Sequence, residues 1–278
     1  MTELLTPDIC IIGAGSGGLL LAAGASQLGA NVVLLERDKM GGDCLNYGCV
    51  PSKSIIAAAK TAQLARNASQ FGISVSAPEI DFKSVHSHIQ HVIASIAPND
   101  SIQRYEGLGV RVIRKKGYFV NPREVSAGNI LIRAKRFVIA SGSSPKIPDI
   151  EGIEGVSYLT NKTIFELTDA PSRLIVIGGG PLGCELSQAY RRLGAEVTLL
   201  EKGQILSKED PELSAVVKKK LLEEGINLRE QVNIISARQE RNTITISFSG
   251  SDQLNSLKGS HLLIAAGRTP NLNDLCLD

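Results

Sequence analysis

Aromatic side chains are scarce in this chain, since Phe, Tyr and Trp make up 4% of its 278 residues and tryptophan is absent. Proteins that bind single-stranded nucleic acid usually stack the bases on such side chains. An excess of one charge is missing too, because 30 Lys and Arg stand against 28 Asp and Glu and leave a net charge of +2. A surface that follows a phosphate backbone carries a stronger basic excess. We therefore expect no nucleic acid partner.

A long uninterrupted hydrophobic run is also missing. The most apolar early stretch, residues 9–25, is interrupted by glycines between positions 13 and 18, and acidic Glu3 and Asp8 precede it. A membrane-spanning helix needs about 20 apolar residues, and a signal peptide starts with basic ones. We therefore expect neither a membrane partner nor secretion.

Cysteine is infrequent, with five residues in the chain. An odd number without a secretion signal argues against a secreted disulfide scaffold and favours a reducing, cytoplasmic location. Any disulfide is then expected to serve chemistry rather than structure.

One order of predicted elements, strand then helix then strand, occurs twice. The first copy covers residues 9–12, 19–28 and 32–35, and the second covers residues 174–177, 182–193 and 197–200. The first glycine after the opening strand is at position 13 in one copy and at position 178 in the other, which is too far apart for a solenoid repeat. The sequence therefore predicts an α/β fold with two Rossmann-like dinucleotide-binding domains.

The domain boundary is predicted at a Pro- and Ser-rich crossing near residues 143–152. The predicted division is residues 1–147, residues 148–270, and residues 271–278 as the start of a return to the first domain. Further helices are expected at residues 54–70 and 85–107. Short strands are expected at residues 110–113, 117–120, 130–132, 137–140, 244–248 and 262–265.

The first copy carries a G-x-G-x-x-G motif between its strand and its helix. In such a motif the first glycine makes a tight turn, the second lets a pyrophosphate approach the backbone, and the third packs the helix on the strand. Gly13, Gly15 and Gly18 take these positions. Glu36 follows at the end of the next predicted strand, where a carboxylate accepts hydrogen bonds from ribose hydroxyls. A glycine-rich turn beside a surface glutamate is the alternative.

The second copy repeats this motif with Gly178, Gly180 and Gly183. Its acidic residue, Glu201, follows Gly178 at the same spacing at which Glu36 follows Gly13. The equal spacing favours dinucleotide binding at both places.

The carboxylate of Glu201 indicates which pyridine nucleotide the second site prefers. A carboxylate accepts hydrogen bonds from a free ribose 2′-hydroxyl and repels a 2′-phosphate, so we expect NAD rather than NADP. Arg191, Arg192 and Lys202 lie close in sequence and keep NADP as the alternative.

Two cysteines lie in the segment GGDCLNYGCVPSK, residues 41–53. Pro51 is tolerated only in the first turn of a helix, so Cys49 is expected at a helix N-terminus, where the helix dipole favours a thiolate. A continuous helix would hold Cys44 and Cys49 on different faces, so a bridge between them requires irregular backbone near Gly48. We expect a reactive cysteine pair.

Two other interpretations of the cysteines have less support. Structural zinc needs four ligands, and no second Cys or His pair lies nearby in sequence. Burial as small hydrophobic side chains suits Cys10 and Cys184 better, because apolar strand or helix residues adjoin them.

The cysteine segment, the two glycine motifs, and the strings at residues 140–145 and 265–271 together resemble the class I pyridine nucleotide-disulfide oxidoreductases. That family includes dihydrolipoyl dehydrogenase, glutathione reductase and mercuric reductase. The resemblance implies FAD in the first domain, NAD(P)H in the second, and a redox-active disulfide between Cys44 and Cys49. It assigns the charge-transfer thiolate to Cys49, substrate exchange to Cys44, and an ion pair near the flavin to Lys53 and Glu185.

Further cofactor contacts are implied only by the resemblance. They include the family's backbone contact to the FAD adenine, two crossovers between domains and a weaker NAD-adenine position. The residues at these positions are Gly42, Gly117, Ser141, Gly142, Val232 and Gly267.

The chain departs from the family pattern at its end. Family members continue to a C-terminal dimerisation domain that carries a His-Glu acid/base pair, whereas this chain ends at Asp278. The expectation is a chain that lacks this domain and forms a monomer or weak oligomer. None of the four histidines matches a family catalytic position, and no metal site is expected. These histidines are His86, His88, His91 and His261.

The function expected from the resemblance is an FAD-dependent enzyme of the dihydrolipoyl dehydrogenase type, with a role in cell redox homeostasis. It would pass electrons between NAD(H), FAD and the Cys44–Cys49 disulfide. A small-molecule disulfide or dithiol, or a protein-bound lipoyl group, would be the substrate. Pro181 stands where glutathione reductases carry an aromatic residue, which argues against glutathione. The alternatives are a mercuric reductase-like enzyme and a truncated, non-catalytic fragment that binds FAD and NAD.

Overall fold

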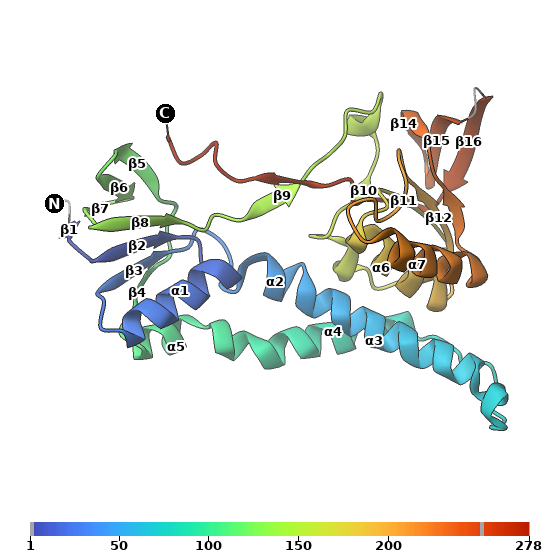
Figure 1. Cartoon of the computed structure of the whole chain (residues 1–278), viewed down its shortest axis with the longest axis horizontal. Coiled ribbons are helices and arrows are strands. Elements are labelled where there is room, and N and C mark those ends of the chain that lie inside the picture. The colour runs from blue at the N-terminus through green and yellow to red at the C-terminus, as the bar shows by residue number, and fades with distance from the viewer. Residues whose placement is uncertain (1–2, 251–252, 278) are drawn as a thin grey trace. The chain divides into compact units, whose positions relative to one another are not determined.

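The computed structural model of the chain describes residues 3–250 and 253–277 (Figure 1). It contains parallel sheets with α-helical connections, which confirms the predicted α/β class. The chain forms two compact units. The first unit combines the segment up to Pro51, His91–Ser144 and the segment from Thr269, and the second combines Ser52–Gln90 and Pro145–Arg268.

The first unit is built on a four-stranded parallel sheet. In β2, Cys10 and Ile12 pack into one hydrophobic cluster while Ile11 packs into another, because alternate side chains point to opposite faces. Helix α1 (Ser16–Gln27) connects β2 to β3 and buries Leu19 and Ala22 on the second face. In spatial order the strands are β4 (Arg111–Ile113), β3 (Val32–Leu35), β2 (Ile9–Ile12) and β8 (Arg136–Ile139).

An antiparallel three-stranded segment lies between β4 and β8 in the sequence. Its residues Val125 and Ile132 join the cluster that contains Cys10, so this segment covers the first face of the parallel sheet. The N-terminal strand β1 pairs parallel to its last strand. The strands are β1 (Glu3–Leu5), β7 (Ile130–Ile132), β6 (Glu124–Ala127) and β5 (Tyr118–Asn121).

The second unit repeats this architecture. Helix α6 (Pro181–Arg192) follows β11 as α1 follows β2, and α7 (Pro211–Glu223) connects β12 to β13. The parallel sheet has the order β10 (Tyr158–Leu159), β17 (His261–Ile264), β11 (Arg173–Ile177), β12 (Glu196–Leu200) and β13 (Asn227–Arg229). The antiparallel segment is β14 (Asn233–Glu240), β15 (Thr243–Gly250) and β16 (Gln253–Gly259).

Strand order in the two parallel sheets confirms the duplication that the sequence predicts. Strands β4, β3, β2 and β8 of the first unit correspond in order to β13, β12, β11 and β17 of the second. In both units the antiparallel segment precedes the last of these strands. Two short strands, β9 (Ser143–Pro145) and β18 (Arg268–Pro270), pair with each other, and each contains one of the points where the chain passes from one unit to the other.

The two copies differ in the connection after their second strand. Between β3 and β4 the first unit has an insertion that begins with α2 (Gly42–Asn46) and α3 (Cys49–Arg66) and continues with α4 (Phe82–Ile96) and α5 (Ile102–Gly107). The predicted helix at 85–107 is therefore wrong as one element. It is broken at η2 (Ala97–Asp100), because Pro98 cannot continue the helix of α4 and the hydroxyl of Ser101 caps α5.

Each unit is assembled from separate segments of the chain. The crossing falls at Ser144 and Pro145, but residues 52–90 group with the second unit. A reason is visible in side-chain contacts of this segment: the ring of Phe82 lies 5.9 Å from the ring of Tyr190 in α6. A sequence-based boundary follows chain order and misses such a grouping. The remaining short elements are η1 (Ala68–Phe71), η3 (Ile153–Gly155) and η4 (Ile164–Glu166).

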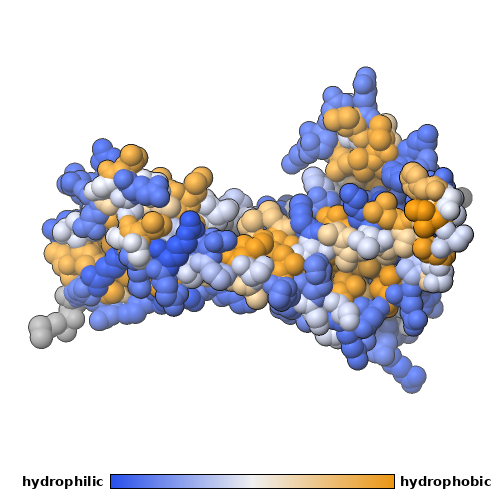
Figure 2. Space-filling model, turned by 90° about the horizontal axis from the view of Figure 1, so that it is seen from below, coloured by the Kyte–Doolittle hydropathy of each residue, from blue (hydrophilic) through white to orange (hydrophobic). Residues whose placement is uncertain are grey.

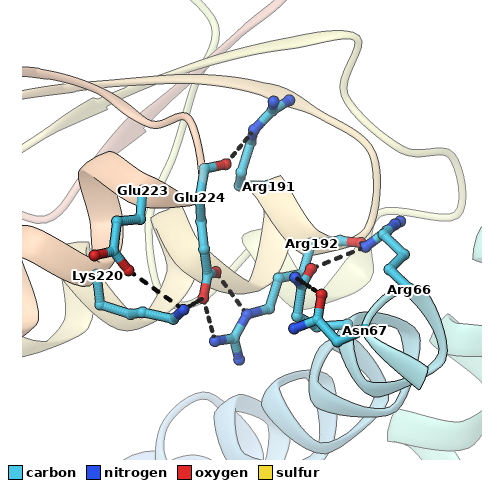
Figure 3. A network of polar contacts seen from close by, with 8 residues as sticks. Arg66, Asn67, Arg191, Arg192, Lys220, Glu223 and Glu224 are labelled. Atoms are coloured by element: carbon cyan, nitrogen blue, oxygen red, sulfur yellow. Dashed lines mark hydrogen bonds and ion pairs between the residues drawn. The ribbon is translucent and has the colours of Figure 1, made fainter. Parts of the chain in front are cut away.

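Within the second unit, a polar network joins the C-terminal ends of three helices (Figure 3). The Arg192 guanidinium makes two hydrogen bonds of 2.7 Å to the buried Glu224 carboxylate. Arg191 donates to the Glu224 carbonyl at 2.9 Å, and Arg66 of α3 donates to the Arg192 carbonyl at 2.6 Å. Lys220 adds a longer ion pair to Glu224 at 3.8 Å. The arginines thus cap helix carbonyls that otherwise have no partner in the helix.

Hydrophobic side chains also reach the surface, as the orange patches among blue residues in Figure 2 show for one face. On α1, Leu20 is 78% exposed and Leu28 just after the helix is 90% exposed, so Leu19 and Ala22 anchor this helix instead. In the described part of the chain, no helix combines the length and apolar character that crossing a membrane requires.

Candidate functional site

The first glycine motif contains two glycines that the fold itself requires. Gly13 has φ of +111°, and a Cβ there would lie 2.3 Å from the carbonyl oxygen of Ala140. A Cβ on Gly18 would lie 1.9 Å from the carbonyl oxygen of Gly13. Gly13 therefore permits the turn after β2, and Gly18 permits α1 to approach it closely.

At Gly15 neither the backbone conformation nor the packing requires glycine. Its φ of −82° suits any residue, and the nearest atom to a Cβ built there is the Cα of Gly42, at 3.9 Å. Gly15 also forms the N-cap of α1 and provides no side-chain cap, so its position leaves amides of the first turn accessible. A bare glycine at an open helix N-terminus fits the close approach of a pyrophosphate.

The second motif repeats each of these features. Gly178 has φ of +110° with the Ala265 carbonyl oxygen 2.4 Å from a built Cβ, and a Cβ on Gly183 would lie 1.9 Å from the Gly178 oxygen. Gly180 has φ of −72°, and no atom lies within 4 Å of its built Cβ. The second motif therefore also leaves its middle glycine open.

The two glutamates predicted for ribose binding lie against these glycine loops. Glu36 accepts hydrogen bonds from the backbone amides of Ala14 at 2.7 Å and Asp38 at 2.6 Å. Glu201 accepts from the amides of Gly179 at 2.6 Å and Gly203 at 2.8 Å. These bonds fix each carboxylate beside its loop, and each oxygen keeps a further lone pair for a ribose hydroxyl.

Helix α2 starts in direct backbone contact with the first glycine loop. The Gly41 amide donates to the Ala14 carbonyl at 2.9 Å, and a Cβ on Gly42 would lie 2.7 Å from the Cα of Gly15. Both residues have positive φ, of 82° and 54°. Glycine at these positions therefore lets the helix of Cys44 meet the loop.

The other predicted glycine positions have packing or turn reasons. A Cβ on Gly117 would lie 2.4 Å from Leu35 Cδ1, so this glycine is required by the core of the first unit. Gly267 has φ of +117° and accepts a hydrogen bond from the Lys146 amide. Val232 is buried and its amide donates to the Glu201 carbonyl at 3.1 Å.

Asn271 connects the residues of the predicted crossover at 140–145. Its side-chain amide donates to the Ser141 carbonyl at 3.0 Å, and its backbone amide donates to the Gly142 carbonyl at 3.0 Å. The Ser144 hydroxyl donates to the Asn271 side-chain oxygen at 2.8 Å. Asn271 thus holds Ser141, Gly142 and Ser144 together, and all four residues belong to the first unit.

The cysteine pair lies where α2 ends and α3 begins. Cys44 is in α2, Cys49 is the first residue of α3, and Tyr47 and Gly48 form the irregular link between the helices. This confirms that Cys49 starts a helix and that the backbone near Gly48 is irregular. Both residues carry thiols in this structure, Cys44 half-buried and Cys49 exposed, with a hydrogen bond between their side chains.

Burial and the hydrogen bond to Cys49 raise the pKa of the Cys44 thiol to about 11. The Cys49 backbone amide acts in the opposite direction. At neutral pH the pair therefore keeps a proton on Cys44. The two other predicted buried cysteines, Cys10 and Cys184, are buried as expected, and burial raises the pKa of each thiol to about 12.

Lys53 and Glu185 form the ion pair that the resemblance implies. The Lys53 ammonium lies 3.1 Å from both carboxylate oxygens, and both residues belong to the second unit. Both side chains are exposed, by 62% and 37%. An ion pair with this exposure contributes little to stability. The pair connects α3 to α6.

Two of the three basic residues that kept NADP as an alternative bind another part of the second unit. Arg191 and Arg192 lie at the C-terminal end of α6 and bind Glu224, roughly 15 Å along the helix axis from its N-terminal glycine loop. Lys202 directly follows Glu201 and is exposed.

One charged neighbour of the cysteine pair was missed by sequence reasoning. Asp100, at the end of η2, acts electrostatically on Cys44. No motif marks it, because Asp100 and Cys44 are far apart in the sequence and belong to different helices of the insertion. The histidines at 86, 88 and 91 lie on α4, and the described residues contain no group of three or more His, Cys, Asp or Glu suited to a metal ion.

Comparison with known proteins places these features in one family. Residues 7–276 match the family described as pyridine nucleotide-disulphide oxidoreductase. The chain is 36% identical over 273 residues to mercuric reductase of Lysinibacillus sphaericus, covering 97% of this chain and 50% of the relative. It is 30% identical over 277 residues to dihydrolipoyl dehydrogenase of Geobacillus stearothermophilus, covering 98% and 58%.

A solved structure shares the fold. The copper(II) complex of the HOCl-induced flavoprotein disulfide reductase RclA from Escherichia coli superposes with a TM-score of 0.81 at 23% identity, over 96% of this chain and 58% of that one. The chain thus spans about half to three fifths of the length of these relatives. The match over residues 7–276 shows that the chain belongs to the pyridine nucleotide-disulphide oxidoreductase family.

Proposed function

We propose that this chain passes electrons between NAD(H), FAD and a redox-active Cys44–Cys49 disulfide. The observation that carries this proposal is the backbone contact between α2 and the first glycine loop, through Gly41, Gly42 and Ala14. That contact holds the helix of Cys44 against the loop whose open glycine fits a pyrophosphate. The family uses FAD and NAD(P), which supports the same assignment.

The chain's own residues fit both cofactors. At the first loop, the bare backbone of Gly15 and the carboxylate of Glu36 would hold the pyrophosphate and a ribose of FAD. At the second loop, Gly180 and Glu201 would hold NAD in the same manner. FAD, when bound, supplies the redox group that accepts an electron pair from the nicotinamide and gives it to the disulfide.

The cysteine pair performs the exchange with substrate. Reduction of its disulfide takes up two electrons and one proton, breaks the sulfur–sulfur bond, and leaves a thiol on Cys44 and a thiolate on Cys49. In the resting reduced pair, the raised pKa of Cys44 agrees with that proton position. Deprotonated Cys44 would attack a substrate disulfide, form a mixed disulfide, and release the other half of the substrate as a thiol.

The substrate is proposed to be a dithiol or disulfide, with a protein-bound lipoyl group as the leading case. Mercuric reductase activity is a second candidate, because the similarity to a mercuric reductase is 36% against 30% for a dihydrolipoyl dehydrogenase. The two candidates share every step up to the reduced cysteine pair.

Thiol trapping tests the proposal. The protein is loaded with FAD, treated anaerobically with NADH, alkylated, and digested for mass spectrometry of the segment that contains Cys44 and Cys49. We expect both cysteines to be unlabelled after oxidation and labelled after NADH, whereas Cys44→Ser and Cys49→Ser form no internal disulfide. A wild-type disulfide that NADH leaves intact in the FAD-loaded protein would contradict electron transfer and favour a fragment that only binds nucleotides.

Nucleotide preference provides a separate prediction. We propose NAD as the partner of the second site, since Glu201 stands beside the glycine loop and Arg191 and Arg192 are committed to Glu224. Replacing Glu201 with Gln is expected to lower the preference for NADH over NADPH by about tenfold, about 1.4 kcal/mol. Fluorescence titration with each nucleotide measures this ratio, and Lys202→Met provides a neighbouring control. Tighter binding of NADPH than NADH by the unaltered protein would refute the assignment.

A further inference from the structure

Asp100 occupies a defined place beside the helix that carries Cys44. It is the last residue of η2, in the first unit. One of its carboxylate oxygens lies 2.9 Å from the position that a Cβ on Gly41 would take. Gly41 is the N-cap residue of α2, with φ of 82°. A side chain at position 41 would meet Leu45 of α2 first and then the Asp100 carboxylate, which therefore lies at the start of this short helix.

The groups that face Asp100 come from two helices. On α5, the positive charge of Arg104 attracts the Asp100 carboxylate, and the Asp100 charge acts on Tyr105. On α2, the Asp100 charge acts on Cys44. In the part of the chain that the structure describes, the carboxylate takes part in no hydrogen bond or ion pair. Partly buried carboxylates are usually held by such bonds.

The charge of the Asp100 carboxylate affects the pKa of the Cys44 thiol. Burial raises the pKa of Asp100, and Arg104 opposes the rise. The pKa of Cys44 is raised by burial first, then by Cys49 of α3, and also by the charge of Asp100. A negative charge near a thiol disfavours the thiolate. The carboxylate of Asp43, on α2 itself, is directed toward Gly48.

We propose that Asp100 is a positioning residue of the cysteine pair, whose carboxylate at the start of α2 keeps the proton of the reduced pair on Cys44 and leaves the negative charge to Cys49. This inference rests on the proposed function. When the disulfide takes up two electrons and one proton, the sulfur–sulfur bond breaks and the proton joins the Cys44 sulfur, on the helix whose start this carboxylate contacts. The electron pair comes from NADH, the reductant of the proposed function.

Alkylation of the two thiols tests this role without any turnover. The reduced protein reacts with iodoacetamide from about pH 6 to about pH 11, and tandem mass spectrometry measures the label on each cysteine separately. In Asp100→Asn we expect Cys44 to be alkylated about threefold faster or more at neutral pH, with its pH profile displaced toward lower pH. Asp100→Ser removes the same charge and is expected to show the same faster alkylation of Cys44. This second variant replaces Asp100→Asn if the first does not fold.

Two matched variants separate this role from a general effect of charge or of structure. Asp100→Glu keeps the charge and is expected to retain the wild-type profile. Glu106→Gln removes an exposed charge on α5 and is expected to leave Cys44 unchanged. Equal Cys44 rates in the wild type and both neutral variants, or an equal increase in Glu106→Gln, would overturn the proposal. If the oxidised wild type forms no Cys44–Cys49 disulfide, the proposed function itself fails. Mass spectrometry of the peptide that contains both cysteines detects this outcome.

Discussion

Replacing Gly15 with alanine is expected to weaken FAD binding by about 100-fold or more, about 2.7 kcal/mol, without loss of stability. The φ of −82° suits alanine, and a Cβ there meets nothing closer than 3.9 Å in the chain. A Gly→Ala change at such a position usually stabilises the protein by about 0.4–1 kcal/mol. The added methyl group instead occupies the space through which a pyrophosphate would reach the α1 amides. Flavin fluorescence quenching gives the affinity, and urea unfolding gives the stability.

Two other glycines of the same helix make the experiment specific. Gly24→Ala lies in open space in the middle of α1 and is expected to stabilise the helix by about 1 kcal/mol while FAD affinity stays unchanged. Gly18→Ala places a Cβ 1.9 Å from the Gly13 oxygen and is expected to destabilise the fold by about 3 kcal/mol or more. Unchanged FAD affinity in Gly15→Ala would show that the first glycine loop is not the pyrophosphate site.

Replacing Arg192 with methionine is expected to lower the free energy of unfolding by about 3 kcal/mol. Among the described residues, the change leaves the Glu224 carboxylate, whose side chain is 5% exposed, with only the longer 3.8 Å pair to Lys220. Most of this cost is the desolvation of an unpaired charge. Replacing both Arg192 and Glu224 with methionine is therefore expected to restore most of the stability, as measured by urea unfolding.

An exposed ion pair on α7 provides the control for this prediction. Lys219 and Glu223 lie 3.9 Å apart with side chains 80% and 50% exposed. Lys219→Met is expected to change stability by less than about 0.5 kcal/mol. A loss of similar size in Lys219→Met and Arg192→Met would show that charge count, rather than the buried pair in Figure 3, determines the effect.

The parts of the fold that the sequence predicted are those with strong local signals. Strand β2 is a continuous apolar run because antiparallel strands cover one face of its sheet and helix α1 packs on the other. The glycine motifs were visible because tight turns and close helix packing demand glycine at Gly13 and Gly18. Strand β14, with its many polar residues, carries no such pattern and was missed.

The parts that were missed depend on contacts distant in sequence. Asp100 reaches the start of α2 because the insertion after β3 folds back on the first unit, and nothing local to Asp100 indicates this. Arg191 and Arg192 were considered near the nucleotide because their sequence positions are close to Glu201. The helix that carries them instead places them at its far end, where Glu224 binds them. The assignments of Cys44, Cys49 and the cofactor contacts to chemical roles stay predictions.

The most direct test of the central claim is the absorption spectrum of the protein, reconstituted with FAD, before and after anaerobic addition of NADH. We expect flavin bands that bleach or develop a long-wavelength charge-transfer shoulder, with the shoulder lost in Cys49→Ser. That result requires both glycine loops and the cysteine pair to act in one chain. A chain that retains no flavin, or a bound flavin whose spectrum NADH leaves unchanged, would contradict the claim.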